Sequence, residues 1–170
     1  MNFCPASRPF KDTDQMDETI IHNWNSRVPI RNSVVYILGD FSFAPMDRTL
    51  KILERLNGDK ILIEGNHDEK YMKDVNFRNR FKEIHKYHSV HAAGVSVRLF
   101  HYPIWEWDGM HKGSVHFHGH LHGGKHGIEG RILDVGMDGN NCMVYDLDKL
   151  TLKMLELPVR THHGRKSEGV

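Results

Sequence analysis

The sequence has few cysteines, no long apolar run and almost no net charge. Its two cysteines, Cys4 and Cys142, are too few for a disulfide framework. No stretch approaches the roughly 20 apolar residues of a membrane-spanning helix, and the first residues lack the apolar core of a signal peptide. A net charge of +1 does not indicate a nucleic-acid or membrane partner. These absences together predict a cytoplasmic protein.

The length of the chain suits one domain. With 170 residues, of which 39% are hydrophobic, the chain is expected to bury one sizeable core. We predict that this domain covers residues 1–158. Residues 159–170 have no apolar face and are expected to form a flexible tail.

Histidine is the residue type present in excess. The chain has 14 histidines, and seven of them fall between His101 and His126. Neutral imidazole is the commonest metal-binding side chain and titrates near physiological pH. The local density of imidazoles therefore raises the expectation of a metal site. His162 and His163, in the tail, are instead expected to lie in solvent.

Hydrophobic patterns predict alternating helices and strands in the first half of the chain. Apolar residues recur every four positions in a helix over residues 14–27, for which Asp14 is a candidate cap. The near-continuous apolar run 34–38 predicts a strand buried on both faces. A helix over residues 46–56, a buried strand over 60–63 and a helical stretch over 69–81 are expected to follow.

The second half is expected to be mostly β-structure. The predicted strands cover residues 84–90, 95–100, 114–117, 131–135 and 143–147, and glycine-rich turns separate several of them. Residues 150–157 fit either a final strand or a helix. This order of elements predicts an α/β (α+β) fold, in which functional groups gather at the carboxyl ends of strands.

Polar motifs follow the expected strands directly. Gly39–Asp40 follows the first buried strand and Gly65–Asp68 follows the second, while His101, His120 and His122 come after later strands. Carboxylate, carboxamide and imidazole without thiolate form a ligand set that suits Mn, Fe, Zn or Ni. Each motif taken singly also fits an ordinary turn, because turns favour Gly, Asn and Asp. Their joint occurrence makes a metal site the better interpretation.

The serial order of these motifs resembles that of calcineurin-like metallophosphoesterases, in particular the small bacterial and phage-type members. Further similar segments are Arg8–Phe10, Trp24–Asn25, Leu38–Phe41, His101–Pro103 and Asp134–Asp138. The resemblance extends to about Leu147. It implies a four-layer αββα sandwich with two mixed β-sheets.

The resemblance also implies a ligand for each position of a dinuclear metal site. Asp40 is expected to bridge the two metals, and Asn66, His101 and His120 to complete the ligands of the second metal. His122 is expected to bind the first metal. The implied cofactors are two divalent transition metals, with manganese favoured and iron, zinc or nickel as alternatives.

Two further residues are implied to act in catalysis. His67 is expected to protonate or stabilise the leaving oxygen, and Asp68 to orient His67. Two cations about 3.5–4 Å apart clamp a phosphate and lower the pKa of a bound water, which supplies hydroxide near neutral pH. The implied function is that of a metal-dependent phosphoric ester hydrolase acting on a small or nucleotide-like phosphodiester or monoester.

The sequence departs from the family at its start. The family opens with Asp-x-His about ten residues before the segment Arg8–Phe10, but residues 1–7 contain neither Asp nor His. That motif would supply two ligands of the first metal and the first strand of the sandwich. The first strand is therefore predicted to be missing, and this chain is expected to fill at least the second metal site.

Three explanations of this departure stay open. The true start lies further upstream, the chain is genuinely short with weak or no activity, or another copy fills the gap in a homodimer. The alternative function is accordingly a non-catalytic or weakly active homologue that binds metal or phosphate. Trp105 and Trp107 are either a stacking wall for a base or ordinary loop packing. His116 and His118 are expected to be structural or to support the ligands.

Overall fold

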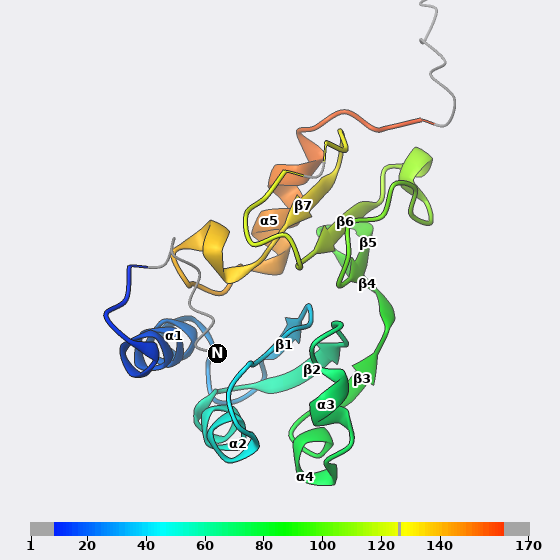
Figure 1. The fold of residues 1–170 in the computed structure, drawn as a ribbon. Coiled ribbons are helices and arrows are strands. Elements are labelled where there is room, and N and C mark those ends of the chain that lie inside the picture. The colour runs from blue at the N-terminus through cyan, green and yellow to red at the C-terminus, as the bar shows by residue number, and fades with distance from the viewer. Residues whose placement is uncertain (1–8, 126, 162–170) are drawn as a thin grey trace, which may run out of the picture.

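The computed structural model describes residues 9–125 and 127–161, which form a mixed α/β structure with two β-sheets (Figure 1). The elements are α1 (Thr13–Arg27), β1 (Val34–Ile37), α2 (Met46–Arg55), β2 (Asp59–Ile63), α3 (Glu69–Met72), α4 (Val75–Arg78), β3 (Glu83–His85), β4 (Tyr87–Ala92), β5 (Val95–Phe100), β6 (Val115–His118), β7 (Ile132–Asp134) and α5 (Leu147–Leu155), with 3₁₀ turns η1 (Met110–Lys112) and η2 (Met137–Asn140). Cys4, Arg8, His126, His162 and His163 lie outside the described residues.

The two sheets differ in topology. The first has the order β1-β2-β3 and is parallel, and the second has the order β4-β5-β6-β7. In the second sheet β4 and β5 form an antiparallel hairpin, while β5, β6 and β7 run parallel. The two-sheet α/β architecture agrees with the fold class expected from the sequence. The expectation of two mixed sheets is wrong for the first sheet, whose described strands are all parallel. Within the described residues, we find no helix that has both the length and the apolar character to cross a membrane.

The N-terminal helix is confirmed with one correction at its cap. Its cap is Asp12, whose carboxylate accepts a hydrogen bond from the backbone N–H of Gln15 at 2.8 Å. Asp14, the expected cap, is instead in the first turn and pairs with Arg48 at 2.6 Å. Both residues favour a helix start, but only Asp12 has the extended backbone that a capping residue needs.

Strand β1 is less buried than its apolar sequence predicts. It was expected to be buried on both faces, yet Val34 is exposed and both Tyr36 and Ile37 are half-buried. The neighbouring strand β2, in contrast, is buried from Lys60 to Ile63, as expected. The difference follows from topology, because β1 is the edge strand and β2 the central strand of their sheet.

Residues 84–90, expected to be one strand, belong to two strands in different sheets. Strand β3 ends at His85 beside β2, and β4 begins at Tyr87 beside β5. The chain therefore passes from one sheet to the other within this stretch. The sequence pattern of residues 84–90 indicates an extended chain but does not indicate which strands it pairs with. It therefore does not predict the break at Lys86.

Two expectations near the C-terminus are also settled by the structure. Residues 143–147, expected to be a strand, are irregular up to Asp146, which caps α5 by accepting a hydrogen bond from the N–H of Lys149 at 3.0 Å. The ambiguous stretch 150–157 is helical as far as Leu155. The expected helix over 69–81 is likewise two short helices, because Asp74 caps a second start.

The largest core cluster joins the two sheets. It contains Ile61 and Ile63 of β2 together with residues of β4, β5 and β6 and Met154 of α5. A second cluster packs α1 against β1 through Trp24 and Val35. Burial of this apolar surface holds the carboxyl ends of β1 and β2 close to those of β5 and β6, where the polar motifs lie.

Candidate metal centre

Four loops at the carboxyl ends of strands carry the polar residues. Asp40 follows β1, Asn66 follows β2, His101 follows β5 and His120 follows β6. The loops are joined by hydrogen bonds between the sheets: His101 Nδ1 lies 2.7 Å from the carbonyl oxygen of Leu38, and Gly119 N–H donates to the His101 carbonyl at 3.0 Å. Residues up to 80 positions apart are thus brought to one place.

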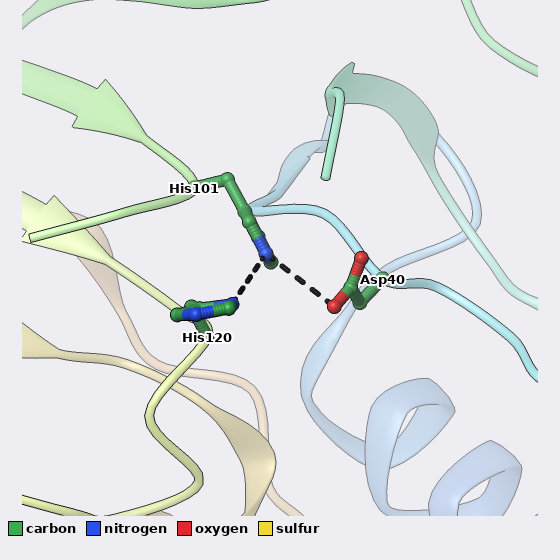
Figure 2. Close-up of side chains that lie close together, drawn as sticks. All are labelled: Asp40, His101 and His120. Carbon is green, nitrogen blue, oxygen red and sulfur yellow. Dashed lines mark hydrogen bonds and ion pairs between the residues drawn. The ribbon is translucent and has the colours of Figure 1, made fainter. Parts of the chain in front are cut away.

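The side chains of these loops converge on Nε2 of His101, and Figure 2 shows this for Asp40 and His120. This atom lies 3.4 Å from Oδ2 of Asp40, 3.1 Å from Oδ1 of Asn66 and 3.2 Å from Nδ1 of His120. Ligand atoms of Asp40, His101 and His120 all lie within 4.8 Å of one another. The structure therefore brings together four of the five metal ligands expected from the sequence.

Two glycines allow this close approach. Gly39 has a left-handed backbone with φ of +83°, and a Cβ there would lie 2.5 Å from Nδ1 of His101. A Cβ at Gly65 would lie 2.6 Å from the backbone nitrogen of Asp40. Any larger residue would push the loops apart, which explains in physical terms why both polar motifs begin with glycine.

Three of the expected ligands have a left-handed backbone conformation. Asp40, His120 and His122 all have positive φ, at 53°, 72° and 51°. Left-handed conformations are uncommon for residues other than glycine and cost free energy, so they persist where the surrounding structure enforces them. Four other described non-glycine residues, Asn32, Ala93, Asn141 and Cys142, also have positive φ, so it is the convergence of the side chains that identifies the candidate site.

Asp68 supports the centre in a way that the sequence did not predict. It is fully buried, and its carboxylate accepts hydrogen bonds from the backbone N–H groups of Asp40 at 2.8 Å, Phe41 at 3.0 Å and Gly65 at 2.9 Å. These hydrogen bonds hold two ligand-bearing loops together, and the role of Asp68 in orienting His67 stays a prediction.

His67 is exposed and lies beside Asp40. Its backbone N–H donates to Oδ1 of Asp40 at 2.8 Å, and its ring packs on Phe43 with 4.8 Å between centroids. The imidazole is therefore held next to the cluster without belonging to it. This placement is compatible with the proton-donating role expected from the sequence.

The electrostatics of the centre favour an ionised carboxylate. Burial raises the pKa of Asp40, but the contact with the His101 imidazole and the hydrogen bond from the His67 N–H outweigh this and leave the pKa below its usual value. Burial lowers the pKa of His101, but the contacts with Asp40 and the Leu38 carbonyl raise it overall. Burial and the charge of His101 lower the pKa of His120. Burial raises the pKa of Asp68, against the effect of its backbone hydrogen bonds.

His122, the fifth expected ligand, lies outside the convergent group. It is exposed, and its Nδ1 is 3.1 Å from Oδ2 of Asp138. The contact of Asp138 with His122 could not be predicted from the sequence, because no sequence spacing connects the two residues. Other aromatic neighbours were also missed: Tyr102 packs on His120 with 4.7 Å between ring centroids, and Phe43 packs on His67.

The remaining candidate residues lie outside the convergent group. Trp107 is buried and donates a hydrogen bond to Ser114, so it is loop packing and not a stacking wall. Trp105 is exposed and covered on one face by the Arg160 guanidinium, 4.0 Å from the ring centroid. His116 and His118 are fully buried in β6, as expected for histidines of the sheet.

A large cavity lies between α1, β1, the second sheet and α5. Its volume is about 1410 Å³, and its apolar walls include Trp24, Ile37, Phe117 and Leu147. Asp40, His120, His122 and Asp138 also line it, so the cavity opens onto the candidate metal centre. Ligand pockets usually measure about 300–1,000 Å³, which makes this cavity larger than one small molecule requires.

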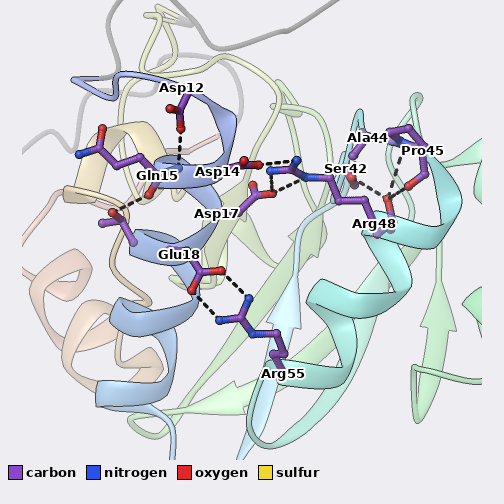
Figure 3. Close-up of polar contacts among 12 residues, drawn as sticks. Asp12, Asp14, Gln15, Asp17, Glu18, Ser42, Ala44, Pro45, Arg48 and Arg55 are labelled. Carbon is purple, nitrogen blue, oxygen red and sulfur yellow. Dashed lines mark hydrogen bonds and ion pairs between the residues drawn. The ribbon is translucent and has the colours of Figure 1, made fainter.

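One wall of the cavity is held in place by ion pairs. Arg48 of α2 pairs with Asp14 and Asp17 of α1, at 2.6 and 2.5 Å, and Arg55 pairs with Glu18 at 2.6 Å (Figure 3). These pairs fix α1 against α2. The apolar face of α1 is therefore held at the cavity even though no strand of the described residues pairs with the outer edge of β1.

Comparisons with known proteins support the fold and leave the function open. No family model matches the chain. It is 31% identical over 119 residues to the uncharacterized protein MJ1445 of Methanocaldococcus jannaschii, a match that covers 69% of this chain and 59% of that protein. The chain thus spans less than two thirds of the length of that curated relative.

A solved structure has the same overall fold. It is the protein of unknown function AQ665 from Aquifex aeolicus, with a TM-score of 0.62 and 23% sequence identity. The match covers 82% of this chain and 83% of that chain. The similarity supports the two-sheet α/β architecture over most of the described chain.

Replacing Asp68 by Asn is expected to destabilise the protein. An amide offers one acceptor oxygen where the carboxylate serves three backbone N–H groups, and its NH₂ would face one of them. A buried donor left without an acceptor costs about 1–3 kcal/mol. Urea unfolding should show a loss of this size, whereas Glu69→Gln at the exposed neighbouring acid should leave stability unchanged. Equal stability of the two variants would contradict the bridging role.

Proposed function

We propose that this protein is a metal-dependent phosphoesterase of the calcineurin-like type, acting on a small or nucleotide-like phosphoester. The observation that carries the proposal is the convergence of Asp40, Asn66 and His120 on Nε2 of His101. Four side chains from four loops meet at one point, at the end of the sheets where α/β proteins bind ligands.

The donor atoms at this point fit a divalent cation. A carbonyl oxygen only accepts hydrogen bonds, so the 2.7 Å contact with Leu38 makes Nδ1 of His101 the protonated nitrogen. Nε2 then presents a lone pair, as do the oxygens of Asp40 and Asn66 that surround it. A cation satisfies all of these atoms at once, and the mixed N/O set suits manganese, iron, zinc or nickel.

The residues of the centre divide into two roles. Asp40, Asn66, His101 and His120 would hold the metal, which supplies charge to polarise a phosphoryl oxygen and to acidify water. His67, anchored to Asp40 only through its backbone N–H, keeps its ring beside the cluster. An imidazole at this position can donate a proton to the departing alkoxide.

We also propose that the architecture is the αββα sandwich with one further strand beside β1. The outer edge of β1 is unpaired within the described residues, and apolar walls of both sheets and α1 enclose the space next to it. Unpaired backbone groups beside apolar surface cost free energy. An additional parallel strand would pair these groups and cover the apolar surface.

A second candidate function is supported by the position of His122. Within the described residues a single group of His and Asp atoms has the spacing of a metal site, and His122 is outside it. A protein with one occupied position could bind metal or phosphate for regulation or assembly without hydrolysis. This candidate differs from the first in activity and not in metal binding.

Manganese loading and an aryl phosphodiester assay test the proposal. We expect at least one Mn²⁺ per chain after loading and dialysis, and hydrolysis of bis(4-nitrophenyl) phosphate that stops when EDTA removes the metal. Binding of Mn²⁺ without hydrolysis would support the binding protein instead. Substoichiometric Mn²⁺ with no hydrolysis would overturn both functions.

A further inference from the structure

The contact between His122 and Asp138 determines which nitrogen of His122 can coordinate a cation. Nδ1 lies 3.1 Å from the Asp138 carboxylate, which only accepts hydrogen bonds when ionised. Nδ1 therefore carries the proton, and Nε2 carries the lone pair. The Asp138 side chain is 10% exposed and that of His122 is 42% exposed, so the carboxylate lies behind the ring and the imidazole at the surface of the cavity.

Asp134 links the two segments that carry this pair. Its Oδ2 accepts a hydrogen bond from Gly123 N–H at 3.2 Å, directly after His122. Its Oδ1 accepts one from Gly136 N–H at 2.8 Å, two residues before Asp138. One carboxylate at the end of β7 thus sets the distance between the loop of His122 and the turn of Asp138.

The loop of His120 and His122 is conformationally specified. Both histidines have positive φ, while Leu121 between them lies in a short turn closed by the bond from Gly124 N–H to the Leu121 carbonyl at 2.7 Å. A solvent-exposed loop without further constraint would favour glycine or asparagine at such positions. The strain is consistent with a need for imidazoles at these two places.

We propose that Asp138 is a positioning residue for His122 and orients this histidine toward the other of the two expected cations, the one for which His122 is the expected ligand. Asp40, His120 and His122 line the same cavity, so His122 faces the same space as the first cation position. A carboxylate behind a ligand histidine fixes its tautomer and orientation and raises its basicity. The inference rests on the proposed function, because it requires the first cation position.

Manganese titrations of the wild type and of Asp138→Asn test the inference. The wild type is expected to bind a second Mn²⁺ more weakly than the first and to develop the electron paramagnetic resonance signal of two exchange-coupled ions. In Asp138→Asn the second affinity should fall about 10- to 100-fold with the first affinity unchanged. Asp138→Glu, which keeps the carboxylate, should recover part of it.

A matched control separates this role from a general loss of charge. Asp108 likewise contacts a nitrogen-bearing side chain, the guanidinium of Arg98 at 2.6 Å, and Asp108→Asn should leave both affinities unchanged. Three results would overturn the inference: one ion per wild-type chain, an unchanged second affinity in Asp138→Asn, or equal loss of both affinities. Failure of the first ion to bind in the wild type would instead overturn the proposed function.

Discussion

Replacing His67 by Ala is expected to lower the turnover of an aryl phosphodiester about 10²- to 10⁴-fold while Mn²⁺ binding stays intact. The backbone N–H of His67, and not its ring, contacts Asp40. Alanine keeps this N–H, so the position of Asp40 should not change. The ring makes its contact with Phe43 at the surface, so its removal should cost little stability. The variant therefore isolates proton donation from metal binding.

Steady-state kinetics and metal analysis on the same preparation check this expectation. His91→Ala removes another exposed histidine, on β4 and away from the cluster, and should retain wild-type turnover. A leaving group of low pKa should reduce the effect of His67→Ala, since such an alkoxide needs little protonation. If His67→Ala hydrolysed a substrate with a poor leaving group at the wild-type rate, this would refute the role of His67 as the acid.

Replacing Asp40 by Asn is expected to abolish Mn²⁺ binding in the micromolar range and, with it, hydrolysis. The amide can still accept the N–H bond of His67, so the loop should keep its conformation. It cannot supply negative charge 3.4 Å from Nε2 of His101, and its NH₂ would face the other lone pairs of the centre. Loss of an anionic ligand should therefore weaken the metal site far more than it changes the fold.

Isothermal titration with Mn²⁺ and circular dichroism together test the Asp40 variant. Asp47→Asn removes an exposed carboxylate from the first turn of α2 and should bind Mn²⁺ like the wild type. An Asp40→Asn protein that is folded and retains wild-type affinity for Mn²⁺ would exclude Asp40 as a ligand. Phosphodiester hydrolysis that persists in this variant would show that the activity arises elsewhere.

Sequence patterns predicted the helices and strands of the first half well because local signals agree there. The helix over residues 14–27 and the buried strand over 60–63 match α1 and β2 within one residue. One incorrect strand prediction lies where pairing with other strands determines the structure. Residues 84–90 divide between two sheets, an outcome that depends on pairing with the distant strands β2 and β5. Residues 143–147 instead lead into a helix that Asp146 caps locally.

Asp68 and Asp138 mark the limit of prediction at the site. Asp68 was assigned to its sequence neighbour His67, but it binds the backbone of Asp40 and Phe41, 28 and 27 positions away. Asp138 meets His122 across 16 positions. Sequence spacing predicts neither contact. Each carboxylate binds the hydrogen-bond donors that the folded chain brings near it from other loops.

The sequence by itself determined the ligand types and their placement at strand ends. Strand length, apolar runs and glycine positions are local properties, so Asp40, Asn66, His101 and His120 could be selected without a structure. Only the tertiary structure decided that these four meet at one nitrogen and that His122 is set apart from them. Convergence depends on which strands pair and how two sheets pack, and these contacts between remote residues leave no local pattern in the chain.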